Sequence, residues 1–455
     1  MPGTDRERYA SEFVGTYVLV MSVGCSVLTG SALAPLCIAA ALTVLVFALG
    51  GVSGAHFNPA VTTAVLFMGI IDLQTAMIYI VMQLLAGVAG GISYLFLFGR
   101  TFNLIPKSGF TWIGAGTVEV VYTFFLVFVV LNTACTQGFS NTKAKQQFAG
   151  IAIGLSLLAG ITSAGYVSGA MLNPALALGV DLASAGIGFG YCLAYMVFQL
   201  LGGVAAAGFT CVLRPSQIGD GTSGEIIHDH AKYLAEFVGL FLFAFTVGLN
   251  AIQGPDHVLG VFGIAAALVA LVYAVSDVSG AHLNPAVTFA LWARGQRDMD
   301  AGKVVMYWLC QFAGAGVGGL LCVGLTWKSV SVGPQPGYTW VSVVVVETIF
   351  TFVLTFVVLC VTSLSTSRNL TDFYGFAIGF SVVAGGYAVG KISGGYLNPA
   401  LVVAMDLGQA AKTARFGRSI AYVLVQILGA GFAALVFATT RKHEMKGVKS
   451  FKLTW

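Results

Sequence analysis

The sequence predicts an all-α membrane protein made of two tandem copies of one bundle, each with six transmembrane helices and two re-entrant half-helices. Three observations lead to this prediction. Hydrophobic residues make up 57% of the 455 residues and charged residues only 9%, against roughly a quarter in soluble domains. The tripeptide Asn-Pro-Ala occurs four times, always within an apolar stretch, and landmarks of the first half of the chain recur in the second.

The spacing of these landmarks defines the two copies. Four pairs of equivalent residues lie 224 to 228 positions apart: Glu12 and Glu236, Asn58 and Asn284, Glu119 and Glu347, and Asn173 and Asn398. Within each copy, a span with an early Glu followed by Asn-Pro-Ala occurs twice. The chain is therefore a duplication of a duplication.

Twelve apolar segments are long enough to cross a hydrocarbon layer of about 30 Å as helices. They lie near 10–30, 33–52, 75–98, 111–133, 147–166, 187–211, 232–252, 258–279, 302–325, 339–361, 372–390 and 418–438. We expect a first domain at 1–213, a linker at 214–231, a second domain at 232–440 and a basic tail at 441–455. Most Lys and Arg residues fall on the side of the termini, which predicts cytoplasmic termini and an exposed cytoplasmic linker from Arg214 onward.

Each Asn-Pro-Ala is expected to start a half-helix of roughly ten residues, too short to span the bilayer. Asn is a good N-cap, and Pro at the first helical position loses only an amide that has no partner there. Non-helical backbone at membrane depth is tolerated where it lines a wet cavity, so half-helices meeting tip to tip predict a pore. The predicted pore residues are Asn58, Pro59, Ala60, Asn173, Pro174, Ala175, Asn284, Pro285, Ala286, Asn398, Pro399 and Ala400.

Paired helix starts place positive dipole ends mid-membrane, where Asn amides can donate to a passing oxygen and cations are disfavoured. The buried carboxylates of Glu12, Glu119, Glu236 and Glu347 need partners, and loop backbones would supply them; a proton relay is the alternative. His56 and His282 are interpreted as neutral side chains that tie the loops; titration of the two imidazoles is the alternative. Asp181 and Asp406 lie near the C-terminal ends of their half-helices, and we expect them to be solvent-exposed because they oppose the dipole there.

The loops SGAHFNPAVT (53–62) and SGAHLNPAVT (279–288), each followed by SGAMLNPAL (168–176) or SGGYLNPAL (393–401), resemble the signature loops of the aquaporin, or major intrinsic protein, family. The resemblance covers nearly the whole chain, twice over. It implies two aquaporin-like bundles, each a right-handed arrangement of six tilted helices and two half-helices around one pore. Because the family usually assembles four pores, it also implies a homodimer that packs as a four-pore pseudo-tetramer.

The resemblance also locates an outer constriction, where water-selective members place an aromatic residue, a His and an Arg. This chain has Leu at the Arg position in both copies, which leaves a filter that selects by size and dewetting and favours small uncharged solutes. Lys391, in the outer loop of copy two, is interpreted as a solvated residue; the alternative is that it swings toward the pore mouth and restores a charge there. By family spacing the constriction residues are Ile38, Ile161, Ala170 and Leu176 in copy one, and Ile264, Gly386, Gly395 and Leu401 in copy two.

The predicted function is a passive channel for water or small uncharged solutes such as glycerol, urea, ammonia or hydrogen peroxide, with one pore per copy. The alternative is a non-conducting membrane scaffold or junction protein of the same fold, because a narrow apolar ring can stay dry. The eight Cys residues are scattered singly through apolar segments. No catalytic pair, metal-ligand cluster, cofactor motif or nucleic-acid-binding feature stands out, so we expect no enzyme, no metal, no cofactor and no nucleic-acid partner.

Overall fold

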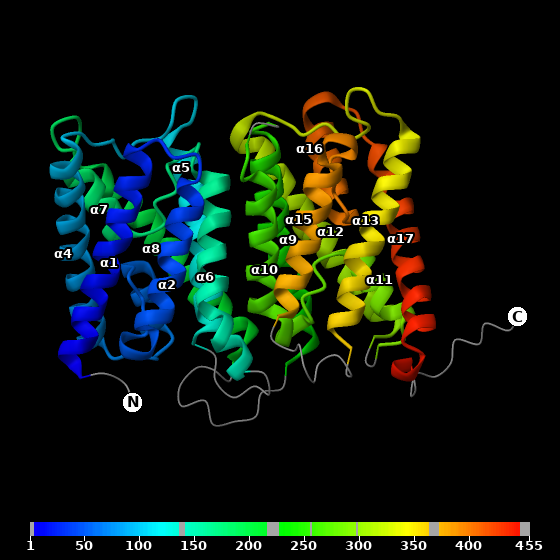
Figure 1. Ribbon diagram of the computed structural model, residues 1–455, viewed down its shortest axis with the longest axis horizontal. Coiled ribbons are helices and arrows are strands. Elements are labelled where there is room, and N and C mark those ends of the chain that lie inside the picture. The colour runs from blue at the N-terminus through cyan, green and yellow to red at the C-terminus, as the bar shows by residue number, and fades with distance from the viewer. Residues whose placement is uncertain are drawn as a thin grey trace, which may run out of the picture. The chain divides into compact units, whose positions relative to one another are not determined.

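The computed structural model describes residues 4–135, 142–215, 227–254, 257–296, 299–363 and 373–445, and every regular element within them is helical (Figure 1). Contacts divide the chain into two units. Unit 1 comprises Met1–His228 and Val258–Asp277, and unit 2 comprises Asp229–His257 and Val278–Trp455. Parts of the predicted linker (216–226) and of the predicted basic tail (446–455) lie outside the described residues.

Twelve helices in the described residues are long and apolar enough to cross a membrane, which confirms the predicted fold class. Their ends lie within a few residues of the expected ones. Copy one supplies α1 (Asp5–Leu28), α2 (Ala34–Ser53), α4 (Leu73–Phe98), α5 (Trp112–Thr133), α6 (Thr142–Ala164) and α8 (Tyr191–Leu213). Copy two supplies α9 (Asp229–Ala251), α10 (Gly260–Ser279), α12 (Ala301–Thr326), α13 (Trp340–Val361), α15 (Tyr374–Ser393) and α17 (Arg418–Thr440).

Four shorter helices begin at the Pro of each Asn-Pro-Ala. They are α3 (Pro59–Phe67), α7 (Pro174–Ala183), α11 (Pro285–Ala293) and α16 (Pro399–Thr413). In each, the preceding Asn has an extended backbone and its side-chain oxygen accepts a hydrogen bond from the backbone N–H of the Ala. The helix α16 is longer than expected because it continues through a polar, alanine-rich segment to Ala414, which ends it in a left-handed conformation.

Glycine lets the half-helices approach the spanning helices closely. A Cβ atom built on Gly87 of α4 would lie 2.2 Å from the carbonyl oxygen of Ala175, and one on Gly91 would lie 2.2 Å from that of Gly179. In unit 2, a Cβ on Gly319 of α12 would lie 2.6 Å from the carbonyl oxygen of Ala404 on α16. Without a hydrophobic force between helices in lipid, such close backbone contact is a main source of packing energy.

The helix α10 belongs to copy two in the sequence but packs within unit 1. Ala266 of α10 forms an apolar cluster with Ala39 of α2 and Leu158 of α6. The Tyr273 ring stacks on Phe148 of α6, with ring centroids 5.3 Å apart and planes within 7°. The contact units therefore do not coincide with the two sequence copies, and the predicted domain boundaries remain a prediction.

Arg214 corrects one expectation. We predicted that the exposed linker begins at this residue, but Arg214 caps the end of α8 and its side chain is fully buried. The position of Arg214 at the end of a predicted span led us to expect a solvent-exposed side chain. The buried position arises because other helix ends supply polar partners for the guanidinium.

We predict that Gly91→Ala lowers the free energy of unfolding by about 1–3 kcal/mol, the usual cost of overpacking. The added methyl group would overlap the Gly179 carbonyl, whereas Gly208→Ala on α8 is a matched control because a Cβ there meets nothing within 4 Å. Thermal unfolding of the purified variants in mild detergent measures the difference. Equal unfolding temperatures for the two variants would contradict the packing argument.

Candidate functional site

A buried carboxylate lies behind each loop that precedes an Asn-Pro-Ala. In the first loop, Glu12 of α1 accepts hydrogen bonds from the backbone N–H groups of His56 (3.0 Å) and Phe57 (2.7 Å). The Ser53 hydroxyl, at 2.7 Å, and the Gln83 amide, at 2.8 Å, donate to the same carboxylate. Four donors converge on one acceptor group, so its negative charge is compensated inside the protein.

The same arrangement recurs in all four loops, which we call the pore loops: residues 54–57, 169–172, 280–283 and 394–397. Each Glu accepts from one Ser hydroxyl, two successive backbone N–H groups and one Gln amide, at distances from 2.6 to 3.2 Å. This geometry favours the supporting role that we expected of the four carboxylates over a proton relay. The further sets are Glu119 with Ser168, Met171, Leu172 and Gln199; Glu236 with Ser279, His282, Leu283 and Gln311; and Glu347 with Ser393, Tyr396, Leu397 and Gln426.

The pore loops hold non-glycine residues in the left-handed backbone region. Ala55 has a φ of 53° and Phe57 a φ of 49°. Such conformations cost roughly 1–3 kcal/mol each and persist only where surrounding contacts enforce them. The hydrogen bonds to the carboxylates provide that enforcement. The equivalent residues are Ala170, Leu172, Ala281, Leu283 and Leu397, together with Gly395 at a φ of 61°.

Sequence analysis missed the Tyr and Gln partners of the pore loops. On α4, Tyr79 lies one turn before Gln83, and its hydroxyl donates to the Ser53 carbonyl at 2.8 Å. The other three loops repeat this contact at 2.6 to 2.8 Å. A spacing of four places both side chains on one helix face, so the repeated Tyr-x-x-x-Gln pattern could have revealed them. The repeats are Tyr195 and Gln199, Tyr307 and Gln311, and Tyr422 and Gln426.

The tips of two half-helices meet in each copy. The side-chain amide of Asn58 donates to the carbonyl of Leu172 at 2.9 Å, and that of Asn173 donates to the carbonyl of Phe57 at 2.9 Å. Each carbonyl belongs to the residue before the opposite Asn, so the half-helices pair within a copy, as expected. In copy two the bonds run from Asn284 to Leu397 and from Asn398 to Leu283, both at 2.9 Å.

The two His residues bind their own half-helices. His56 Nδ1 lies 3.1 Å from the Thr62 hydroxyl, and His282 Nδ1 lies 3.1 Å from the Thr288 hydroxyl. Both hydroxyls also accept a hydrogen bond at 2.9 Å from the Gln of the adjacent spanning helix. This placement agrees with a role in tying the loop.

The predicted constriction residues fall in both units. In unit 1, Ile38, Ala170 and Leu176 are buried and Ile161 is half-buried; in unit 2, Leu401 is buried and the two Gly residues are half-buried. A Cβ built on Gly395 would lie 3.5 Å from the Cα atom of Gly386, so these two positions are neighbours. Ile264 lies on α10, which is part of unit 1. All eight are uncharged and non-aromatic.

Asp181 and Asp406 are buried, so the expectation of solvent exposure was wrong. Each caps the start of the next spanning helix, whose own cap residue is a Gly without a side chain. Asp181 accepts from the backbone N–H groups of Gly190 (2.8 Å) and Cys192 (3.1 Å). Asp406 accepts from the N–H of Gly417 and from the N–H and hydroxyl of Ser419. In each case, the attraction of the carboxylate to the positive N-terminal end of the spanning helix outweighs its repulsion by the negative C-terminal end of the half-helix.

Within the described residues, no group of three or more His, Cys, Asp or Glu side chains could hold a metal ion.

Comparisons with known proteins agree with this architecture. The model of the major intrinsic protein family matches residues 4–207, 136–247, 225–387 and 372–453. The chain is 34% identical over 209 residues to the glycerol uptake facilitator protein-like 6 of Lactiplantibacillus plantarum, covering 44% of this chain and 94% of the relative. It is 33% identical over 217 residues to the probable aquaporin TIP2-1 of Oryza sativa subsp. japonica, covering 45% of this chain and 85% of the relative.

Among solved structures, the aquaglyceroporin from Plasmodium falciparum is similar at 23% identity and a TM-score of 0.39, covering 45% of this chain and 95% of that one. The fold and the family match define a multi-pass integral membrane protein that is a passive channel and not an enzyme. The chain belongs to the major intrinsic protein family and contains two tandem copies of it.

We predict a graded response when the support of the third pore loop is removed. Tyr307→Phe deletes one hydrogen bond, to Ser279, and is expected to cost about 1 kcal/mol of stability. Glu236→Leu leaves four donors without their acceptor, at roughly 1–3 kcal/mol for each buried group, and should prevent recovery of folded protein. Size-exclusion chromatography and thermal unfolding measure both effects. Normal recovery of Glu236→Leu would contradict the supporting role.

Proposed function

We propose that this chain conducts water and small uncharged solutes of the glycerol, urea, ammonia and hydrogen peroxide class, through one pore in each copy. The observation that carries the proposal is the pairing of two half-helix starts in each copy by reciprocal Asn hydrogen bonds. The amide of Asn58 uses one N–H for the Leu172 carbonyl and its oxygen for the helix cap. The second N–H has no partner among the described residues and is suited to a passing solute oxygen.

Electrostatics support passage of neutral molecules. The two half-helices of a copy start at the same place, so the positive ends of their dipoles add there. A cation at this point would lose its hydration and face like charge, whereas a water or alcohol oxygen would gain donors. The nearby carboxylates do not reverse this effect, because each accepts four hydrogen bonds, two of them from its own pore loop.

The proposed filter is apolar in both copies. Leu176 and Leu401 stand where Arg would supply charge and hydrogen bonds, so selection rests on size and on the cost of dewetting. Copy two has Gly395 and Gly386 where copy one has Ala170 and Ile161, which supports a wider opening in copy two. A solute larger than water should therefore pass more readily through copy two.

We also propose the homodimer with four pores, with both termini cytoplasmic. In unit 1, Leu155 and Thr162 of α6 pack against α10. Their equivalents 225 residues later, Phe380 and Tyr387 of α15, are exposed. Similarly, the α10 residues Phe262, Gly263 and Tyr273 have as their equivalents Leu36, Cys37 and Phe47 of α2, which are exposed. A second chain could therefore cover α15 with α2 in the way that α10 covers α6.

The assembly is testable with a natural Cys. A Cβ built on Gly263 would lie 2.8 Å from Thr162 Cβ, so the equivalent positions 37 and 387 of two chains should lie close enough for a disulfide. We predict that Tyr387→Cys forms a covalent dimer through the partner subunit's Cys37 under mild oxidation, seen on a non-reducing gel. Adding Cys37→Ser should remove the dimer band. A crosslink that survives this second change would contradict the proposed arrangement.

We predict that Leu176→Arg and Leu401→Arg raise discrimination against solutes larger than water, because Arg narrows the path and rewards hydrogen-bonding molecules. Leu401→Arg should have the larger effect, since two Gly residues leave room for the guanidinium. Swelling of proteoliposomes under water, glycerol and urea gradients measures this for wild type and variants. The proposed selectivity would be refuted if the wild type passes water but excludes glycerol and urea, and if the Arg variants have the same fluxes as the wild type. The absence of any flux would favour a non-conducting scaffold.

A further inference from the structure

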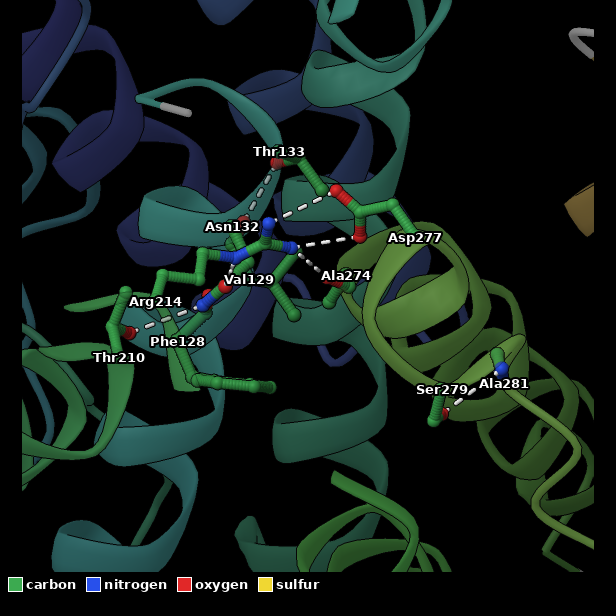
Figure 2. Close-up of polar contacts among 10 residues, drawn as sticks. All are labelled: Phe128, Val129, Asn132, Thr133, Thr210, Arg214, Ala274, Asp277, Ser279 and Ala281. Carbon is green, nitrogen blue, oxygen red and sulfur yellow. Dashed lines mark hydrogen bonds and ion pairs between the residues drawn. The ribbon is translucent and has the colours of Figure 1, made fainter. Parts of the chain in front are cut away.

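Arg214 is a fully buried arginine held by three helix ends of unit 1. Its guanidinium forms a two-point ion pair with Asp277, with nitrogen to oxygen distances of 2.7 and 3.0 Å (Figure 2). The third nitrogen, Nε, donates to the side-chain oxygen of Asn132 at 2.7 Å, and Nη2 also lies 3.4 Å from the Ala274 carbonyl. Hydrogen-bond partners therefore lie along two edges of the planar guanidinium, and the single ammonium group of a Lys could not make the same contacts.

The three side chains of this network come from different helices. Asn132 lies in the last turn of α5, Arg214 caps the end of α8 and Asp277 lies in the last turn of α10. The Asn132 amide is itself fixed, since it donates to the Phe128 carbonyl at 2.8 Å and the Thr210 hydroxyl at 3.1 Å. A positive charge at helix C-terminal ends is also favoured by their dipoles. The network thus joins α10 to two helices of copy one.

This polar set occurs at one of the two equivalent places in the duplicated sequence. Arg441 is the counterpart of Arg214, but it is partly exposed and pairs locally with Glu444 at 3.0 Å. The residues at the positions of Asn132, Thr210 and Asp277 are Cys360, Phe437 and Gly51. The Asn, Thr and Asp around Arg214 are thus specific to the place where the end of α8 meets α10.

The position of Asp277 in the chain indicates a role for these residues. Two residues later, the Ser279 hydroxyl donates to Glu236 at 2.7 Å and accepts from the N–H of Ala281 at 3.1 Å. Ser279 ends α10 and opens the pore loop that leads to Asn284. The last turn of α10 therefore sets where the chain enters the first pore loop of copy two.

We propose that Arg214 and Asp277 form a lock that holds the end of α10 on unit 1, and that Arg214 is thereby a positioning residue for the second pore. The inference rests on the proposed function, because it assigns a role in conduction by copy two. A buried ion pair is rarely a net source of stability, and its best-attested use is to select one arrangement among alternatives. Here the selected arrangement is the one in which Asp277 binds α10 to unit 1. The equivalent helix α2 has Gly51 in place of this Asp.

The test measures the two pores separately in the full chain. Leu176→Trp, which fills the filter of copy one, reports flux through copy two, and Leu401→Trp reports flux through copy one. In each background we compare Arg214→Met and Asp277→Asn with the matched control Arg441→Met. Glycerol flux into proteoliposomes and hydrogen exchange of residues 274–281, against the equivalent 48–55, are the readouts.

We expect Arg214→Met and Asp277→Asn to lower flux through copy two several-fold and to raise exchange at 274–281 alone. Flux through copy one and the Arg441→Met variant should stay at the level of their backgrounds. Equal losses in both copies, or unchanged copy-two flux in a folded variant, would overturn the lock. If Arg214→Met does not fold, Arg214→Lys keeps the charge, loses the two-point contact and should show the same pattern.

The two proposals fail in different ways. If neither Trp background conducts before the lock is altered, the proposed function fails. Hydrogen exchange still decides where the lock acts, because it requires no flux. Increased exchange spread equally over 48–55 and 274–281 would remove the specific role of Arg214.

Discussion

Each pore loop leaves the helical conformation at membrane depth, where an unpaired backbone N–H costs several kcal/mol because no lipid group can replace water. One interaction solves this problem four times: a buried Glu accepts two successive loop N–H groups, a Ser hydroxyl and a Gln amide. Glu12 shows the arrangement in full. The carboxylate stays compensated, the loop stays in its left-handed conformation, and the half-helix behind it points in one direction.

The pairing of half-helices depends on that support. When two loops are held at fixed positions, the Asn of one can reach the carbonyl that precedes the Asn of the other, as Asn58 and Asn173 do. The close approach of α4 and α7 through glycine then fixes the distance between half-helix and wall. The positive helix ends and the amide donors follow from this geometry, and none of these groups has to change its charge.

The two copies share this framework and differ around it. At the proposed filter, copy two has Gly395 and Gly386 where copy one has Ala170 and Ile161. At the helix ends, Arg214 meets Asp277 of another helix, whereas Arg441 pairs with Glu444 three residues further along the chain. The two copies therefore share the supports of the pore loops, and differ at the residues of the proposed filter and at the contacts of Arg214 and Arg441.

Much of the fold and part of the site could be predicted from the sequence. Apolar length, the four Asn-Pro-Ala tripeptides and the four Glu residues determine the spans, the half-helices and the need for buried partners, because backbone satisfaction in lipid admits few solutions. The partners themselves depend on which helices lie together. Tyr79 binds the carbonyl of Ser53, 26 residues away, and Gln83 binds Glu12, 71 residues away. Asp181 was misjudged because its local dipole is unfavourable, and the start of α8, nine residues on, decides its position. Arg214 looked like the first residue of a linker, and only tertiary packing, which brings the ends of three helices together, makes its burial possible.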